Sequence, residues 1–334
     1  MNNPLVSIIM PAYNCVDFIG QAIQSILDQS YTHFELIIID DCSTDGTLQA
    51  IRPFMASDHR IRLLTKEKNT GYTKSLNQGI SNAQGTFIAR LDADDIAIPN
   101  RIATQLNFLL QNPAVGVCGS WALELDSQEL IKVPVHHEEI MTMLLFRNSI
   151  IHPSVMFRQE LVNNPVFDSQ YEPSEDFHLW SKLSTITRFH NIPQALIQKR
   201  LHHQQVSHIQ QDNQRANAIK IMNMTLQRLG IQATPQELRL HYETTRGDFP
   251  KEINYLTRVS DWLLRIQHQN LQTRIYPEPA ITQLLKQIWQ KHIAGQTHLG
   301  APFLEIVQQN PLSEYHEWNN YQKMKFKAKC LLRK

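Results

Sequence analysis

Short, almost continuously apolar segments alternate with segments of helical spacing over the first 120 residues, and this alternation is the strongest constraint on the fold. Val6–Met10 and Glu35–Ile39 are predicted strands, and the apolar residues between Ile19 and Leu27 recur at helical spacing. The second strand is too continuously apolar for one face to meet solvent, so we expect both faces to be covered. This order predicts βαβ units and a mostly parallel sheet, the α/β class.

The alternation continues downstream and then changes character. Residues 60–64 and 86–91 are predicted strands, and residues 71–81 and 101–110 are predicted helices. Residues 121 to about 208 have mixed patterns that complete the first domain, and from about residue 210 the pattern is helical and rich in Gln. We therefore predict an α/β domain of residues 1–209 and a helical C-terminal extension of residues 210–334 with a basic tail.

Composition excludes several classes of protein. Lys and Arg total 32 against 31 for Asp and Glu, so no overall field attracts nucleic acid and we expect no nucleic-acid partner. No apolar stretch approaches the roughly 18–20 residues of a membrane-spanning helix. The N-terminus lacks the basic segment and cleavage site of a signal peptide. The four cysteines lie far apart without metal or disulfide spacing, which favours the cytoplasm.

Polar side chains follow three of the predicted strands, at Pro11–Asn14, Asp40–Thr47 and Asp92–Asp95. Ligands bind beyond the carboxyl ends of parallel strands, so we expect one active site at this edge. Asp92, Asp94 and Asp95 repel one another unless a cation lies between them, and a hard divalent ion held by one or two carboxylates keeps positions open for substrate phosphates. Taken alone, the same acids could equally cap the next helix or solvate a turn.

An ordered set of short motifs gives the chain a resemblance to a known family. The motifs are Val-Ser-Ile-Ile-Met-Pro-Ala-Tyr-Asn (6–14), Ile-Ile-Asp-Asp-Cys-Ser-Thr-Asp-Gly-Thr (38–47), Asn-Thr-Gly (69–71), Leu-Asn-Gln-Gly (76–79), Leu-Asp-Ala-Asp-Asp (91–95), His-Pro-Ser-Val-Met-Phe-Arg (152–158), Ser-Glu-Asp-Phe-His-Leu-Trp (174–180) and Arg-Leu-His-His-Gln-Gln-Val-Ser (200–207). Over roughly residues 4–208, this set resembles the inverting glycosyltransferases of family 2. The resemblance implies the glycosyltransferase A fold, that of the nucleotide-diphospho-sugar transferases.

The resemblance implies a donor pocket made by the first two polar clusters. Pro11, Tyr13, Asn14 and Asp41 would bind the nucleotide, with Tyr13 stacking on the base and Asp41 accepting from the uracil imide N–H. The structural alternative for Tyr13 is a core tyrosine at a strand end, and the alternative for Asp41 is a helix cap. Lys74 is a further donor-binding candidate, because family members carry an Arg at the position of Leu76. It could instead be a solvated helix residue.

The resemblance also assigns roles to the third cluster. Asp94 would hold Mn²⁺ or Mg²⁺ on the donor diphosphate, while Asp92 and Ala93 would face the nucleotide. His202 matches a position that approaches the metal or diphosphate, although His203 beside it leaves that assignment open. Asp95 is expected to cap the helix near Arg101.

Glu175 and Asp176 begin a helical pattern, where negative charge is stabilised at the helix N-terminus. The acids could therefore merely cap that helix. The resemblance makes Asp176 the general base that takes the proton of the acceptor hydroxyl, with Glu175 beside it. From its place at a helix N-terminus, we expect a low pKa for Asp176. His152 and Arg158 would flank the acceptor region.

The tail from Trp318 to Lys334 has six basic residues and no acid. Its apolar residues fall on one helical face, namely Tyr321, Met324, Ala328, Leu331 and Leu332. Such an end could rest on anionic lipid. A solvated or disordered terminus is the alternative. We expect a cytoplasmic protein. If the tail does rest on lipid, it would give the protein peripheral contact with the cytoplasmic face of the inner membrane.

The function that these motifs imply is a metal-dependent, inverting transfer of a sugar from a nucleotide donor, expected to be a UDP-sugar. The acceptor would be a hydroxyl of a growing bacterial surface glycan or a lipid-linked glycan. One alternative is a non-catalytic scaffold that binds nucleotide or glycan. The other is a sugar-nucleotide nucleotidyltransferase, which should carry a Gly-rich basic loop, whereas Pro11–Cys15 has neither Gly nor a cation.

Overall fold

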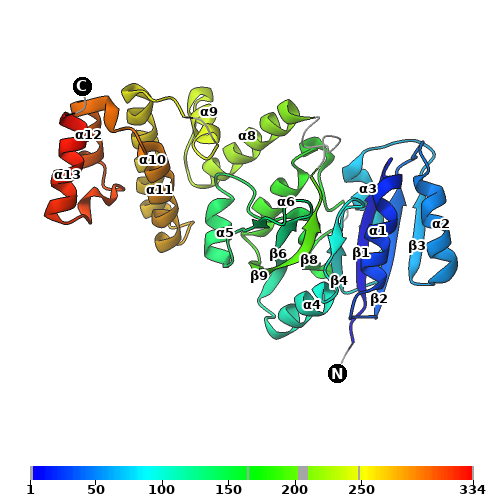
Figure 1. Ribbon diagram of the computed structural model, residues 1–334. Coiled ribbons are helices and arrows are strands. Elements are labelled where there is room, and N and C mark those ends of the chain that lie inside the picture. The colour runs from blue at the N-terminus through cyan, green and yellow to red at the C-terminus, as the bar shows by residue number, and fades with distance from the viewer. Residues whose placement is uncertain (1–2, 164, 202–209, 247–248, 333–334) are drawn as a thin grey trace. The chain divides into compact units, whose positions relative to one another are not determined.

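The computed structural model describes residues 3–163, 165–201, 210–246 and 249–332 (Figure 1). The chain forms two compact units. The first comprises Met1–Ile140 and Asn148–Asn217, and the second comprises Met141–Arg147 and Ala218–Lys334. The units therefore part within α8 (Gln211–Arg228), whose first turns belong to the first unit, where Asn217 Nδ2 donates to the Glu172 carbonyl at 2.9 Å.

One mixed sheet forms the centre of the first unit. Its strand order is β3-β2-β1-β4-β8-β6-β9-β5, with β7 paired to β6. The strands are β1 (Val6–Ala12), β2 (Phe34–Asp40), β3 (Ile61–Thr65), β4 (Phe87–Arg90), β5 (Ile96–Ala97), β6 (Val115–Glu124), β7 (Leu130–Ile131), β8 (Met156–Arg158) and β9 (Arg188–Lys199). The pairs β1–β2, β2–β3, β1–β4 and β6–β9 are parallel, whereas β8 runs antiparallel to β4 and β6.

Helices cover both faces of this sheet, as the continuous apolar strands predict. These helices are α1 (Val16–Leu27), α2 (Thr47–Ser57), α3 (Tyr72–Ser81), α4 (Arg101–Gln111) and α6 (Glu175–Leu183), whereas α5 (His137–Met143) begins in the first unit and ends in the second. Ile8 and Ile38 share a core with the buried residues of α1, α2 and α4. The alternate residues Ile9 and Ile39 face α3, which approaches so closely that a Cβ at Gly79 would lie 2.6 Å from both side chains.

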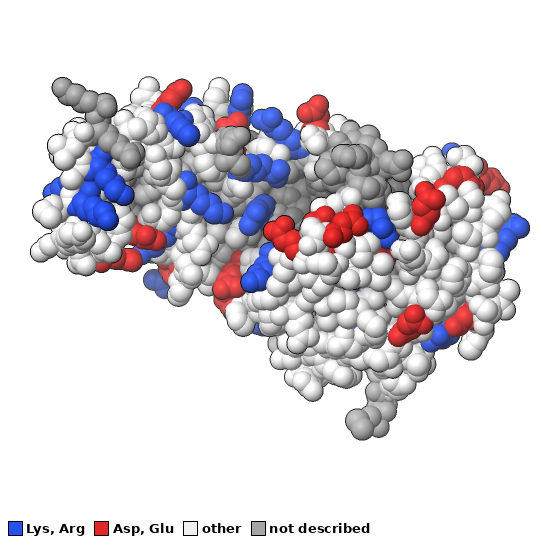
Figure 2. Space-filling view, viewed as in Figure 1, with Lys and Arg blue, Asp and Glu red and all other residues white. Residues whose placement is uncertain are grey.

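The second unit is helical, which confirms the predicted C-terminal helices. It contains α9 (Pro235–Glu243), α10 (Ile253–Thr273), α11 (Glu278–Ile293), α12 (Gly300–Gln309) and α13 (Asn320–Leu331). Its core includes Trp262, Trp289 and Phe303. Figure 2 shows Lys and Arg side chains gathered at the end that carries α13. None of the helices in the described ranges is both long and apolar enough to cross a bilayer.

Candidate active site

The carboxyl ends of three neighbouring strands bring the predicted polar clusters to one edge of the sheet. Ala12 at the end of β1 pairs with Asp40 at the end of β2, and Ile9 pairs with Arg90 at the end of β4. Backbone bonds continue past the strand ends, since the N–H of Asp41 donates to the Ala12 carbonyl at 2.9 Å. The segments that follow the three strands therefore begin side by side.

Residues of the first two clusters lie at this edge in different environments. Pro11 is buried inside β1, whereas the Tyr13 side chain is 48% exposed just beyond the strand. Asn14 joins the two clusters, because its Oδ1 accepts from the Thr44 N–H at 2.8 Å. Its backbone φ of 47° lies in the left-handed region, which asparagine tolerates.

Asp41 is buried and organises the loop before α3. Its Oδ1 accepts from the Thr70 N–H at 2.9 Å and lies 3.1 Å from Lys66 Nζ, and its Oδ2 accepts from the Gly71 N–H at 2.9 Å. A carboxylate oxygen has two acceptor positions, so Oδ2 retains one for a ligand N–H. Asp41 thus holds a loop in place while keeping the capacity that the predicted base contact requires.

Asp92 is tied to the same loop and to the interior of the sheet. The hydroxyl of Tyr72, which follows Gly71, donates to Asp92 Oδ1 at 3.1 Å. The buried guanidinium of Arg90 donates to the same oxygen and lies under the Tyr72 ring, with 5.2 Å from Arg90 Cζ to the ring centroid. Within the described part of the chain, both bonds to Asp92 end on Oδ1, which leaves Oδ2 open to a ligand.

The three acids after β4 form a compact carboxylate cluster. One oxygen from each of Asp92, Asp94 and Asp95 lies within 4.8 Å of the others. Burial, followed by the charges of the two other acids, raises the pKa of Asp95 well above its usual range. Its Oδ2 is buried without a partner among the described residues. An all-oxygen set of this density suits a hard divalent cation, so the residues present fit the expected Mn²⁺ or Mg²⁺.

Asp95 does not cap the helix that starts at Arg101, because its Oδ1 accepts from the backbone N–H of Arg200 at 3.0 Å and Asn100 occupies the N-cap position. The Ala93 side chain is buried, which leaves its backbone for ligand contact. His202 and His203 lie outside the described residues.

Glu175 and Asp176 begin α6, in the position that the sequence predicts. Glu175 is buried, and its Oε2 has no partner within the described residues. Burial, together with the negative charge of Asp176, raises the pKa of Glu175 to about 8. Asp176 Oδ1 accepts from the Phe177 N–H at 2.6 Å, and its Oδ2 accepts from Asn148 Nδ2 at 2.7 Å.

The expected low pKa of Asp176 is wrong. Burial raises the pKa of this carboxyl, and the opposing contributions of the Phe177 N–H, Arg90, Lys199 and Asn148 do not cancel it. The helix N-terminus favours the charged form, but loss of solvent is the larger effect here. A raised pKa makes Asp176 a stronger base than an exposed aspartate.

Two cations connect the acidic cluster to the acids of α6. Arg90 is hydrogen-bonded to Asp92, and its charge also acts on Glu175 and Asp176. Lys199, at the end of β9, acts on both Asp95 and Asp176. The metal-binding candidates and the base candidate therefore belong to one electrostatic neighbourhood.

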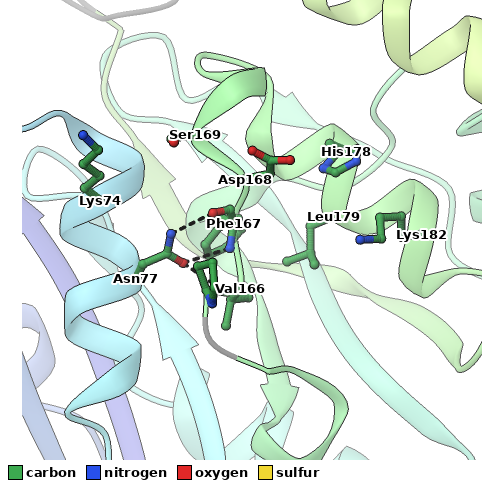
Figure 3. A pocket seen from close by; sticks show the side chains of 10 residues that line it. Lys74, Asn77, Val166, Phe167, Asp168, Ser169, His178, Leu179 and Lys182 are labelled. Carbon is green, nitrogen blue, oxygen red and sulfur yellow. Dashed lines mark hydrogen bonds between the residues drawn. The ribbon is translucent and has the colours of Figure 1, made fainter.

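Lys74 lies in a separate cavity of about 520 Å³ (Figure 3). This cavity is lined by α3, the 165–169 segment and α6, with Lys182 and His178 on the last of these. Asn77 fixes the loop by donating to the Phe167 carbonyl at 2.7 Å and accepting from the Phe167 N–H at 2.8 Å. The residues that line this cavity do not include the acids of the carboxylate cluster. The role of Lys74 in binding the donor stays a prediction.

Arg158 and His152, the two residues expected to flank the acceptor, both make contacts that stabilise the fold. Arg158 donates to the carbonyls of Val115 and Leu109 at 3.1 and 2.7 Å, so its guanidinium is committed to the backbone. The His152 ring lies edge-on to Trp180 with both ring nitrogens buried, and this burial lowers the pKa of His152 well below the usual value. A neutral, enclosed imidazole is suited to packing.

Sequence patterns assigned no role to Tyr72, Arg90, Asn148, Lys199 or Arg200, although Arg200 opens the motif of residues 200–207. Only Arg90 could have been predicted from the sequence. A cation inside a buried strand needs an acidic partner, and the acids follow it directly. The others reach the site from helices, loops and strands whose placement no local pattern specifies.

Comparison with known proteins identifies this arrangement. The model of the family described as Glycosyl transferase family 2 matches residues 7–165. An uncharacterized glycosyltransferase of Haemophilus influenzae is 33% identical over 248 residues, covering 69% of this chain and 77% of that protein. The chain belongs to this family. It is a glycosyltransferase, as the ordered motifs predict.

Further similarities to this family 2 glycosyltransferase extend over sequence and fold. The Escherichia coli UDP-Glc:alpha-D-GlcNAc-diphosphoundecaprenol beta-1,3-glucosyltransferase WfgD is 34% identical over 180 residues, 54% of this chain and 70% of that protein. Staphylococcus aureus TarS 1–349 in complex with UDP superposes with a TM-score of 0.56 at 14% identity, over 87% of this chain and 91% of that one. The mannosyltransferase PcManGT of Pyrobaculum calidifontis, in complex with GDP-Man and Mn²⁺, has a TM-score of 0.55 at 16% identity, over 99% and 86%. These likenesses confirm the predicted glycosyltransferase A fold.

Proposed function

We propose that this glycosyltransferase inverts the anomeric centre of a nucleotide-activated sugar, with a UDP-sugar as donor. The observation that carries the proposal is that the charge of Arg90 acts on two acidic groups. Arg90 is hydrogen-bonded to Asp92 of the carboxylate cluster, and its charge opposes the rise in the pKa of Asp176 of α6. A transfer of this kind needs one group to neutralise the leaving diphosphate and another to take the acceptor proton. The two groups must act on the same sugar.

Asp94 and Asp92 are the proposed holders of Mn²⁺ or Mg²⁺. When bound, the ion supplies a Lewis acid that neutralises charge on the diphosphate. The open Oδ2 of Asp92 and the unpartnered, buried Oδ2 of Asp95 support this assignment, because buried carboxylate oxygens without donors are costly. Asp41, Tyr13 and Asn14 are the proposed base-binding residues, and Pro11 and Ala93 shape the pocket through their backbone.

Asp176 is the proposed general base. Its Oδ2 is oriented by Asn148, and the acceptor hydroxyl gives its proton to this carboxylate as its oxygen bonds to the anomeric carbon. The bond from that carbon to the diphosphate oxygen breaks on the opposite side, and the nucleoside diphosphate leaves. Attack opposite the leaving group inverts the configuration.

The proposed acceptor is a hydroxyl of a bacterial surface glycan, in free or lipid-linked form. Support comes from the name of WfgD and from a Bacillus subtilis relative, described as a putative teichuronic acid biosynthesis glycosyltransferase, which is 38% identical over 140 residues. We propose the cytoplasm as the setting. Four free cysteines, at Cys15, Cys42, Cys118 and Cys330, support a reducing compartment.

The test is a donor panel with purified protein. UDP-, GDP-, CDP- and dTDP-sugars are incubated with Mn²⁺ or EDTA, and the released nucleoside diphosphate is measured with and without acceptor saccharides. We expect turnover with UDP-sugars and Mn²⁺, loss of turnover in EDTA, and a loss of about 10²- to 10⁴-fold in Asp176→Asn. The matched control is Asp261→Asn, at an exposed position of α10. Equal turnover of Asp176→Asn and wild type would reject the base assignment, and nucleotide binding without any turnover would favour the scaffold alternative.

A further inference from the structure

The helix α13 is a folded part of the second unit with a fixed start. Asn319 and Gln322 form a reciprocal cap, in which the Gln322 N–H donates to Asn319 Oδ1 and the Asn319 N–H donates to Gln322 Oε1, both at 2.9 Å. Such a cap stabilises a helix N-terminus. The basic tail of the sequence is therefore an ordered helix through Leu331.

One face of α13 packs into its own unit. Phe326 lies 5.2 Å from Trp318 and 5.9 Å from Phe303, measured between ring centroids. Cys330, one turn later on the same face, is 1% exposed. These contacts fix the rotation of the helix about its axis and so determine what the opposite face presents.

The opposite face is apolar and exposed. Tyr321, Met324 and Leu331 are 65, 62 and 56% exposed, and Leu332, just past the helix, is 81% exposed. At helical spacing these four residues fall in one stripe along the helix, and Ala328 lies in the same stripe between Met324 and Leu331. The helix therefore has two opposite apolar faces, and its own unit covers only the face with Phe326 and Cys330. A contiguous exposed apolar patch indicates an interaction surface.

Lysines border this stripe on both sides. Helical geometry places Lys325 and Lys329 along one border and Lys327, with the half-buried Lys323, along the other. No acid occurs between Trp318 and Lys334. The Lys and Arg side chains at this end are visible in Figure 2.

We propose that α13 is a membrane-docking helix whose exposed stripe enters the interface of an anionic lipid bilayer. The stripe would lie at the level of the acyl chains while the bordering lysines reach the phosphate headgroups, the arrangement of helices that lie in the plane of a membrane. The lysines on both sides of the stripe can contact anionic headgroups at the same time, because the negative charge extends continuously across the membrane surface. This inference goes beyond the transfer reaction and does not depend on it.

Vesicle co-sedimentation of the full chain tests the proposal without a substrate. We expect binding to vesicles of phosphatidylcholine with 30% phosphatidylglycerol, weak binding to pure phosphatidylcholine, and loss of binding in high salt. Lys325→Gln with Lys329→Gln should weaken the partition coefficient on the order of 30-fold, since each lysine near an anionic surface contributes about 1 kcal/mol. Met324→Ser with Leu331→Ser should weaken binding at least as much.

The control is Lys251→Gln with Lys291→Gln, which removes two exposed lysines outside α13 and should leave binding almost unchanged. Point variants are preferable to truncation, because removing α13 would uncover Phe303 and Trp318. Thermal melting and donor turnover with a soluble acceptor check that each variant is folded and active. Equal sedimentation with and without phosphatidylglycerol, or binding unaffected by both α13 variants, overturns the proposal. So does a wild-type dimer in sedimentation velocity that Met324→Ser dissociates, which would make a second copy the occupant.

Discussion

The Arg90 guanidinium donates a hydrogen bond to the carboxylate of Asp92, two residues away, across the end of β4. Arg90 is buried, and its Nε and Nη1 have no partners among the described residues. The same cation acts on Glu175 and Asp176 of α6. One side chain thus joins two acidic groups that are more than 80 residues apart in the sequence.

Arg90→Met should destabilise the protein by about 2 kcal/mol, the contribution of a hydrogen bond between charged groups whose loss leaves Asp92 without its cation. Urea unfolding measures the effect. Arg52→Met, at an exposed position of α2, should change the stability by less than about 0.5 kcal/mol. An Arg90→Met variant as stable as wild type would show that the neighbouring Arg101, also buried, repels Arg90 enough to offset the bond.

Asp94→Asn should raise the melting temperature of the metal-free protein by about 2 °C, because it removes a negative charge from a crowded cluster of three acids. The same change should abolish stabilisation by Mn²⁺, which in wild type reaches about 2.7 kcal/mol at 100 times the dissociation constant. Differential scanning calorimetry with and without Mn²⁺ measures both effects. Asp261→Asn is the control, and an undiminished Mn²⁺ response in Asp94→Asn would remove Asp94 from the metal site.

Asn148→Ala should shift the acid limb of the kcat/KM profile to higher pH. The Asn148 amide lowers the pKa of Asp176, so its removal lets the pKa rise further and keeps the base protonated to a higher pH. Activity should therefore fall more at pH 5 than at pH 8. A uniform loss across the profile would mean that Asn148 acts on the fold alone. Asn163→Ala, at an exposed position, is the matched control.

Glu175→Gln should remove a pH-dependent loss of stability. Folded Glu175 keeps its proton up to a pKa of about 8, whereas the unfolded side chain loses it near 4.5. The unfolded state therefore binds fewer protons between these values, so wild-type stability falls as pH rises from about 4.5 to 8 and then levels off. Glutamine has no such loss, so the variant should gain on the order of 3 kcal/mol relative to wild type between pH 5 and pH 8. Urea midpoints at the two pH values test this, with Glu160→Gln as an exposed control; parallel pH dependences would contradict it.

The parallel βαβ core and the edge that carries the site follow from local sequence patterns. Strand periodicity is local, and strands of this kind end at a common edge, so the segments at Asp41 and Asp92–Asp95 could be placed beside one another without coordinates. The helix that begins at Glu175 and the helical character of the C-terminal part were also readable from spacing.

The hydrogen-bond partners and the pKa shifts of the acids, in contrast, depend on how distant segments pack together. Asp95 accepts from Arg200 instead of capping a helix, and burial raises the pKa of Asp176 against the effect of the helix N-terminus. Both outcomes depend on solvent exclusion and on groups contributed by distant segments, such as Asn148 and Lys199. Likewise, the sequence placed apolar residues on one face of the last helix, but only the packing of Phe326 and Cys330 determined that this face is exposed. Local patterns specify periodicity, whereas exposure and protonation depend on what the rest of the chain places nearby.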